Sequence, residues 1–299
     1  MKKILLHDDT ELKYDIFQSA NYNRQTIKNI NTNSKDNSSI ILIHGGIMAD
    51  ANIPLVTFSY ILSKNYNILH YHRRGYGKSI NNKRNNNNPS SSTISQNVQD
   101  CKDIMDLLNI KRAHIVGHSI GGTIALQLAS TYPDYIQSLI LLEPAITGYN
   151  ENTGQQVIEE FKPIIQMYDK GQKDEAIDIF MKNAIGSNYK DIIANVLPSN
   201  SFELAVVDAK TFFHEEIPSM KLWTFTKNQA KGLLHKKVLH IRGVQKARKI
   251  SKEREDLLNN WLHQTIITTI PNAPHMVQIT NPKEVVQAMN LFLQNVNGF

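Results

Sequence analysis

The feature that most constrains the fold is an alternation of short apolar runs with helical patterns between residues 39 and 142. The apolar runs are continuous, as expected for strands buried on both faces of a parallel sheet. We predict such strands at Ser39–Gly46, Tyr66–Tyr71, Ala113–Val116 and Ile136–Leu142. Helices are predicted between them at Pro54–Ser63, from Ser92 or Thr93 to Leu108, and at Ile120–Ser130. This order predicts an α/β protein whose parallel strands are joined by right-handed crossovers.

The alternation stops at about Thr147, and helical periodicity without strands follows as far as Lys231. We therefore predict a helical insertion over residues 147–231 in a core formed by residues 1–146 and 232–299. The core is predicted to open with a hairpin of Lys2–His7 and Glu11–Ser19. After the insertion we predict strands at Val238–Arg242 and Thr265–Thr269 and helices at Lys252–Leu262 and Pro282–Asn295.

Composition excludes several classes of protein. Hydrophobic residues make up 41% of the 299 residues, which argues against global disorder, and the single cysteine, Cys101, excludes an internal disulfide and a cysteine-rich zinc module. The opening MKKILLHDD has too few consecutive apolar residues for a signal peptide or a membrane span, so we expect a soluble, cytoplasmic protein. The net charge is +6, and basic residues are concentrated between Lys231 and Arg254, where strand-like apolar residues alternate with them. That pattern favours a solvated edge, and we expect no nucleic-acid partner.

The sharpest local motif is a G-x-S-x-G, Gly117 to Gly121, between a predicted strand and a predicted helix. A turn this tight places the central residue in a strained backbone conformation and exposes its hydroxyl at the carboxyl edge of the sheet. Ser119 also precedes a helix N-terminus, whose free N–H groups favour a developing anion. We interpret Ser119 as a nucleophile; a simple helix N-cap is the alternative.

A second motif, His44-Gly45-Gly46, follows a predicted buried strand. Acyl transfer needs two preorganised N–H donors for the oxyanion, one from the residue after the nucleophile and one from a loop that follows an earlier strand. Ile120 is therefore one candidate donor, and Gly46, or Ile47 beside it, is the other. The alternative is that the motif is only a turn.

His275 lies in NAPHMVQITNP, after the last predicted strand. A general base needs a side chain that titrates near working pH and a loop that brings it to the nucleophile. His275 has the right residue type and follows Ser119 in the chain, so we interpret it as the base. A solvated loop histidine is the alternative, since the chain holds 11 histidines.

These landmarks, together with HRRGYGKS at 72–79, make the chain resemble the α/β-hydrolase fold family over roughly residues 39 to 299, and specifically its capped group of esterases and lipase-like enzymes. The resemblance implies a mostly parallel, eight-stranded sheet flanked by helices, with residues 147–231 as the cap. It implies Ser119 as nucleophile, His275 as base, and Gly46 and Ile120 as oxyanion donors. The family's epoxide hydrolases and dehalogenases use an aspartate nucleophile, so Ser119 argues against both chemistries.

The sequence departs from the family pattern at two places. His72 stands where members commonly carry an aspartate two residues before the glycine-loop arginine, and residues 243–246 lack the usual catalytic carboxylate. We assign the acid to Glu143, which ends the strand SLILLE at the same edge as Ser119, as in some capped relatives. Alternatively, the Glu143 carboxylate only caps the turn before Pro144.

We expect a serine hydrolase that cleaves a small or medium carboxylic ester, or a related acyl substrate, through an acyl-enzyme. It would need no cofactor and no metal. Two alternatives remain open: a haloperoxidase-like or C–C bond hydrolase on the same scaffold, and a ligand-binding member that lacks a complete triad. Aromatic residues of the insertion, including Phe212 and Trp223, would line or cover the pocket.

Overall fold

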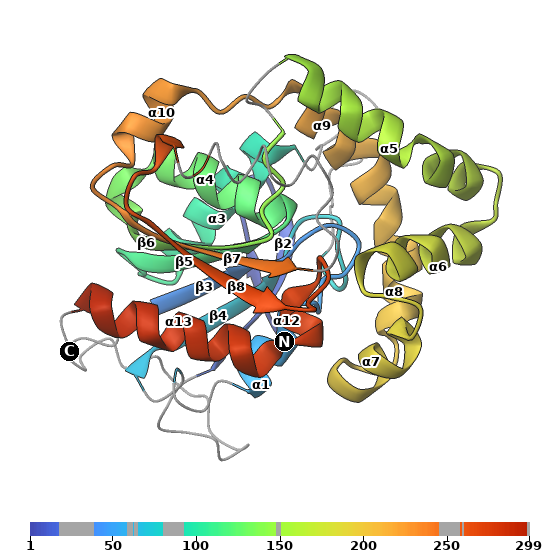
Figure 1. Cartoon of the computed structure of the whole chain (residues 1–299), viewed down its shortest axis with the longest axis horizontal. Coiled ribbons are helices and arrows are strands. Elements are labelled where there is room, and N and C mark those ends of the chain that lie inside the picture. The colour runs from blue at the N-terminus through green and yellow to red at the C-terminus, as the bar shows by residue number, and fades with distance from the viewer. Residues whose placement is uncertain are drawn as a thin grey trace.

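The computed structural model describes residues 1–17, 39–58, 62, 65–79, 93–147, 151–244, 258 and 260–297. One eight-stranded sheet in the order β1-β2-β4-β3-β5-β6-β7-β8 runs through the molecule (Figure 1). Its strands are β1 (Lys2–Leu5), β2 (Glu11–Phe17), β3 (Ser39–Ile43), β4 (Asn67–His72), β5 (Ala113–His118), β6 (Ile136–Leu142), β7 (Lys237–Val244) and β8 (Thr265–Pro271). The pairings β1–β2 and β2–β4 are antiparallel, and the pairings from β4 to β8 are parallel. The predicted mostly parallel α/β sheet is confirmed.

Helices cover both faces of the sheet, because alternate residues of the continuous apolar strands point to opposite sides. Ile41, Ile115 and Leu139 pack with helices α3 and α4 on one face. Their neighbours in sequence, such as Val116 and Ile140, pack with α1 and α13 on the other face. The helices of the two layers are α1 (Ile53–Thr57), α3 (Ile94–Leu107), α4 (Ile120–Thr131) and α13 (Pro282–Asn297).

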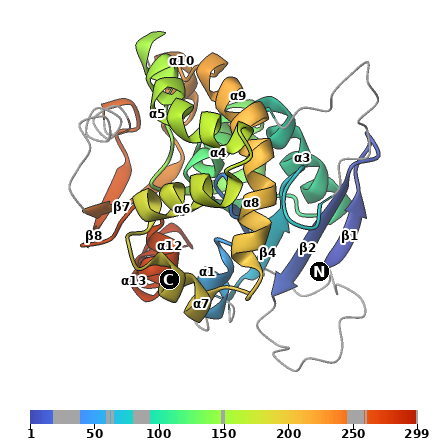
Figure 2. The same cartoon turned by 90° about the vertical axis from the view of Figure 1, so that its right-hand side faces the viewer.

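Between β6 and β7 the chain forms helices without an intervening strand, and we call residues 151–232 the helical segment. It comprises α5 (Glu151–Asp169), α6 (Lys173–Ala184), α7 (Tyr189–Val196), α8 (Ser201–Thr211), the π-helical turn η2 (Phe212–Glu216), α9 (Ile217–Leu222) and α10 (Lys227–Gly232). Figure 1 shows α5 to α8 on the right of the view, to one side of the sheet, and Figure 2 shows the molecule from that side. A separate apolar cluster joins these helices to Ile47, Tyr76 and Met276 of the core.

Several boundaries differ from the predictions. Strand β5 continues to His118, and β7 and β8 continue to Val244 and Pro271, because pairing between neighbouring strands extends beyond the apolar runs. The short helix α12 (Val277–Thr280) and the turn η1 (Pro133–Tyr135) carried no recognisable periodicity. Most of the predicted helix Lys252–Leu262 lies outside the described residues, as do Glu253, Glu255 and Asp256. No helix in the described part of the chain has the length and apolarity needed to cross a membrane.

Candidate active site

Ser119 occupies the turn between β5 and α4 with φ 52° and ψ −123°. A positive φ is costly for a residue with a side chain and persists only where the surroundings enforce it. Here the Ser119 N–H donates to Leu142 O at 3.0 Å, and the Ser119 carbonyl accepts from Gly122 and Ala145 at 2.9 Å. The side chain makes no capping hydrogen bond to α4. The simple N-cap interpretation of Ser119 is therefore not supported by the geometry.

Two glycines of the motif are required by close backbone contacts. A Cβ atom on Gly117 would lie 2.3 Å from Gly121 O, and one on Gly121 would lie 2.4 Å from Ile43 O. Both distances are far inside normal contact, and both partners are main-chain atoms that cannot rotate away. The glycines thus let β5 turn sharply into α4 directly beside β3.

His275 lies between β8 and α12 and faces Glu143. Its Nδ1 atom is 3.5 Å from Glu143 Oε2, an ion-pair distance that is longer than a good hydrogen bond. The other Glu143 oxygen, Oε1, accepts the Gly243 N–H at 2.6 Å, so the carboxylate also caps the end of β7. Glu143 has φ 43° and is held at the edge by a bond from its N–H to Ile241 O at 3.0 Å.

The loop that carries His275 is held next to Ser119 by a contact with His118. His118, the residue before Ser119, uses Nε2 to contact His275 O at 3.1 Å, and the two imidazole rings lie 5.0 Å apart. Burial, and next the nearby His275, lower the pKa of His118 to about 3. His118 is therefore a neutral anchor for the His275 loop. The prediction from sequence did not assign it a role, although it is the variable residue before the serine of G-x-S-x-G.

Within the described residues, no hydrogen bond joins Ser119 Oγ to His275. Catalytic hydrogen bonds in ligand-free structures are often long and tighten only when substrate binds. With Nδ1 of His275 directed at Glu143, Nε2 is the nitrogen that remains for the serine hydroxyl.

The loop after β3 lies against the nucleophile. A Cβ atom on Gly45 would lie 3.2 Å from Ser119 Cβ, and one on Gly46 would overlap the ring of Phe212 at 2.2 Å. Ile47 is fully buried with φ 68°. In the part of the chain that the structure describes, the N–H groups of Gly46, Ile47 and Ile120 donate no hydrogen bond. Buried N–H groups are nearly always paired, so these three are available for a ligand.

Arg73 and Arg74 are both fully buried but serve different parts of the structure. Arg74 pairs with Asp100 on α3 at 2.6 Å and with Asp8 at 3.0 Å. Arg73 instead contacts the loop after β3 and Glu216 of the helical segment. Burial is the largest single influence and lowers the pKa of Arg73, but the Glu216 carboxylate together with Tyr76 and Tyr71 raises that pKa overall.

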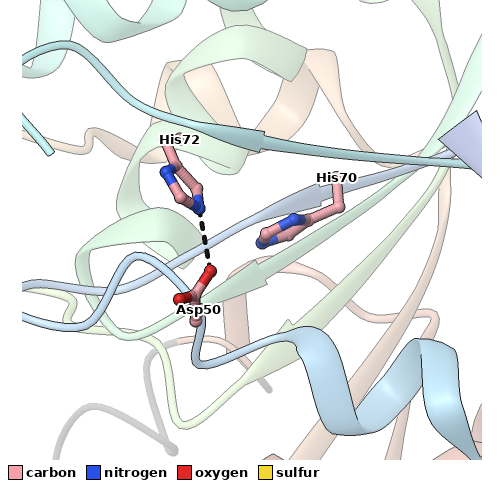
Figure 3. A group of neighbouring side chains, drawn as sticks. All are labelled: Asp50, His70 and His72. Carbon is pink, nitrogen blue, oxygen red and sulfur yellow. Dashed lines mark hydrogen bonds and ion pairs between the residues drawn. The ribbon is translucent and has the colours of Figure 1, made fainter. Parts of the chain in front are cut away.

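The residues nearest to a metal-ligand arrangement in the described chain are Asp50, His70 and His72 (Figure 3). His72 Nδ1 accepts the Lys78 N–H at 3.1 Å, so Nε2 carries the proton that it donates to Asp50 at 2.9 Å. His70 Nε2 contacts Ala49 O at 3.2 Å and is also protonated. A metal ligand needs a free lone pair, and both Nε2 atoms are committed to N–H bonds. Of the four imidazole nitrogens only His70 Nδ1 has no partner among the described residues, so the set does not offer two histidine ligands. The arrangement fits a hydrogen-bonded network in which Asp50 partners His72.

Asp208 of α8 is a second group that sequence reasoning did not identify. It is buried, and its Oδ1 accepts the Gly77 N–H at 2.8 Å. Burial raises its pKa to about 7, and the negative charge of Asp50 adds to the effect. Thr211 donates to Gly75 O at 2.9 Å on the same glycine loop. The loop 73–77 is thus the main polar contact between the core and the helical segment.

Comparison with known proteins supports one family. The family model described as "alpha/beta hydrolase fold" matches residues 39–242. The chain belongs to the α/β-hydrolase family. An esterase from Thermogutta terrifontis superposes with a TM-score of 0.73 at 16% identity over 99% of both chains. A bromoperoxidase from Bacillus anthracis gives 0.73 at 16% identity over 98% of this chain and 100% of that one.

Among sequence relatives, a 2-hydroxy-6-oxo-6-phenylhexa-2,4-dienoate hydrolase of Comamonas testosteroni is 36% identical over 72 residues. That match covers 24% of this chain and 25% of the relative. The chain spans between a fifth and two fifths of the length of the curated relatives that it matches. The family model thus establishes membership of the α/β-hydrolase family. The partial matches to individual enzymes do not identify the reaction.

Proposed function

We propose that the chain is a serine hydrolase that cleaves small or medium carboxylic esters, or related acyl substrates, through an acyl-enzyme. The observation that supports this most strongly is the meeting of three features at one sheet edge. These are the strained backbone of Ser119, the His275–Glu143 pair at 3.5 Å, and the N–H groups of Gly46, Ile47 and Ile120, which donate no hydrogen bond within the described residues. Each feature alone has a structural alternative, but together they supply a nucleophile, a base with its orienting acid, and an oxyanion site.

The proposed reaction follows from these positions. Ser119 Oγ attacks the substrate carbonyl as its proton passes to His275 Nε2, and Glu143 stabilises the imidazolium through Nδ1. The N–H groups of Ile120 and of Gly46 or Ile47 bind the oxyanion. The tetrahedral intermediate collapses as His275 protonates the leaving alkoxide, and water then releases the acid from Ser119 by the same steps. No step calls for a metal or an organic cofactor.

We further propose that the helical segment acts as a cap that sets acyl-chain preference. It emerges after β6, at the carboxyl edge that carries Ser119, and ligands of open α/β sheets bind at this edge. Phe212 of this segment lies against Gly46 in the loop 44–47 that follows β3, which we call the oxyanion loop. Phe161 and Phe180 pack on Phe212 with ring centroids 5.5 Å and 6.0 Å away.

Hydrolysis of p-nitrophenyl acetate, butyrate and octanoate by the wild type and by Ser119→Ala tests the proposal. We expect turnover with the wild type and a loss of about 10⁴- to 10⁶-fold in the variant, with the melting temperature retained. Near-wild-type rates in Ser119→Ala would show that the nucleophile is wrong.

A C–C bond hydrolase is the second candidate, favoured by the likeness to the Comamonas testosteroni enzyme. Such an enzyme would cleave a conjugated 2-hydroxy-6-oxo-dienoate faster than any ester. Comparing kcat/KM for a compound of that class with kcat/KM for the three esters separates the two candidates.

A further inference from the structure

A buried arginine outside the proposed triad connects the helical segment to the oxyanion loop. The guanidinium of Arg73 has five N–H bonds, and each finds an acceptor. Nε donates to His44 O at 3.1 Å and Nη2 to Gly45 O at 2.9 Å. Nη1 donates to Asn97 Oδ1 at 3.2 Å, and both Nη atoms bind the Glu216 carboxylate. No freedom of orientation remains for this side chain.

The contact with Gly45 O matters because of peptide geometry. A trans peptide is planar, and its C=O and N–H bonds point in opposite directions. The oxygen of Gly45 and the N–H of Gly46 belong to the same peptide unit. His44 Nδ1 contacts the same oxygen at 2.7 Å, so that both lone pairs of Gly45 O are engaged from one side. The Gly46 N–H must therefore point away from Arg73, and within the described residues it donates no hydrogen bond.

Arg73 and His44 hold this peptide through Gly45 O, because a glycine-glycine sequence has no side chains of its own to restrain it. Glycine has the widest choice of backbone conformations, so an unrestrained Gly45-Gly46 peptide could flip and turn its carbonyl toward the nucleophile. A carbonyl oxygen in place of the N–H would repel an oxyanion.

We propose that Arg73 is a positioning residue that fixes the Gly45–Gly46 peptide with the Gly46 N–H in the oxyanion site, and that Glu216 locks Arg73 in place from the helical segment. The inference rests on the proposed function. Glu216 lies in η2, and its Oε2 also accepts the Tyr76 hydroxyl at 2.6 Å. The same η2 turn begins with Phe212, which covers Gly46. One turn of the helical segment thus both locks the arginine and packs on the peptide that the arginine orients.

Arg73→Lys tests the proposal. Lysine keeps the positive charge but has a single ammonium group, which cannot reach both carbonyls and the carboxylate as the planar fork does. Since loss of one oxyanion donor costs about 10²- to 10³-fold in kcat, we expect kcat for p-nitrophenyl butyrate to fall by about 10- to 100-fold, with KM within about threefold. A trifluoromethyl ketone, which forms a tetrahedral adduct, should lose affinity by a similar factor.

Arg74→Lys is the matched control, because Arg74 is equally buried and is also paired with a buried carboxylate, Asp100, but does not contact the loop 44–47. It should lower the melting temperature as much as Arg73→Lys does and leave kcat within about twofold. Glu216→Gln is the second variant, since it keeps an acceptor for Tyr76 while it weakens the lock on Arg73. It should lower kcat by about 3- to 10-fold, less than Arg73→Lys.

The outcomes separate this inference from the proposed function. Wild type that fails to react with a fluorophosphonate probe would overturn the serine hydrolase and the inference with it. Wild type that reacts, with Arg73→Lys keeping both kcat and trifluoromethyl ketone affinity, would overturn the inference alone. An equal kcat loss in Arg74→Lys would also overturn it, because the effect would then be general destabilisation.

Discussion

The central strands and the helical segment differ in how much of their surface is buried and in how apolar residues are spaced along them. Strands β3, β5 and β6 are buried along almost their whole length and read as continuous apolar sequence. Helices such as α5 bury one stripe and leave the rest in solvent. The sheet therefore supplies a rigid edge that fixes Ser119 and Glu143, whereas the helical segment supplies a half-buried cover. The proposed function divides along the same line, with reaction chemistry assigned to the sheet edge and substrate selection to the helical segment.

If that division holds, a change at the sheet edge should reduce the rate for every substrate. Glu143→Gln keeps an acceptor for the Gly243 N–H but can no longer stabilise the His275 imidazolium. We expect kcat to fall by about 10²- to 10⁴-fold on all three esters, with little change in melting temperature.

Asp103→Asn on α3 is the control, because Asp103 is also a buried carboxylate, and within the described residues its hydrogen bond is with Gln99 on its own helix. Its kcat should stay close to wild type. Full activity in Glu143→Gln would mean that Glu143 only caps β7 and that His275 has another partner.

The two regions should also differ in their response to acid. Burial is the largest cause that lowers the pKa values of His70, His114 and His240 to about 4 and of His118 to about 3, and the pKa of His44 also falls well below 6.5. All five belong to the core. Between pH 6.5 and 4 the unfolded chain binds protons that the folded chain does not, so stability falls as pH decreases. Each histidine contributes at most about 1.4 kcal/mol per pH unit.

Asp208, from the helical segment, works in the opposite direction. Its pKa of about 7 in the folded chain lies above the ordinary value of 3.8, so its contribution to stability is largest in acid and is lost as pH rises from about 4 to 7. Five core histidines outweigh one carboxylate. We expect the urea midpoint to fall from pH 7 to pH 5, and Asp208→Asn to raise the midpoint at pH 8. A midpoint independent of pH would show that these side chains are not buried as described.

The smallest expected effect is on substrate selection. Phe212 packs on Gly46, so Phe212→Ala should change the ratio of kcat/KM between butyrate and octanoate esters by about 3- to 10-fold. Trp223 was expected to line the pocket too, but it packs in the cluster with α3 and α4, and its Nε1 donates to Gln127 at 2.9 Å.

Trp223→Ala is therefore the matched control: it should lower the melting temperature and leave the ester ratio unchanged. A ratio that moves equally in both variants would contradict the assignment of selection to the cover over Gly46.

Sequence reasoning succeeded where the signal was local. The continuous apolar run Ile136–Leu142 predicts a buried strand by itself. The G-x-S-x-G at Ser119 likewise predicts a tight strand-to-helix turn, because only glycine fits its close backbone contacts. Chain order placed His275 after the last strand, and the structure brings it to 3.5 Å from Glu143; its role as the base stays a prediction. Arg73 and Glu216 are 143 residues apart and belong to segments with no shared pattern, so only the folded chain brings them together. His118 was missed because its role depends on a carbonyl 157 residues away.

The most direct test of the central claim is the reaction of the intact protein with a fluorophosphonate probe, followed by mass spectrometry. The account predicts one adduct per chain, located on Ser119, absent from Ser119→Ala and formed more slowly in Glu143→Gln. An adduct on any other residue, or ester turnover by a protein that forms no adduct, would contradict it.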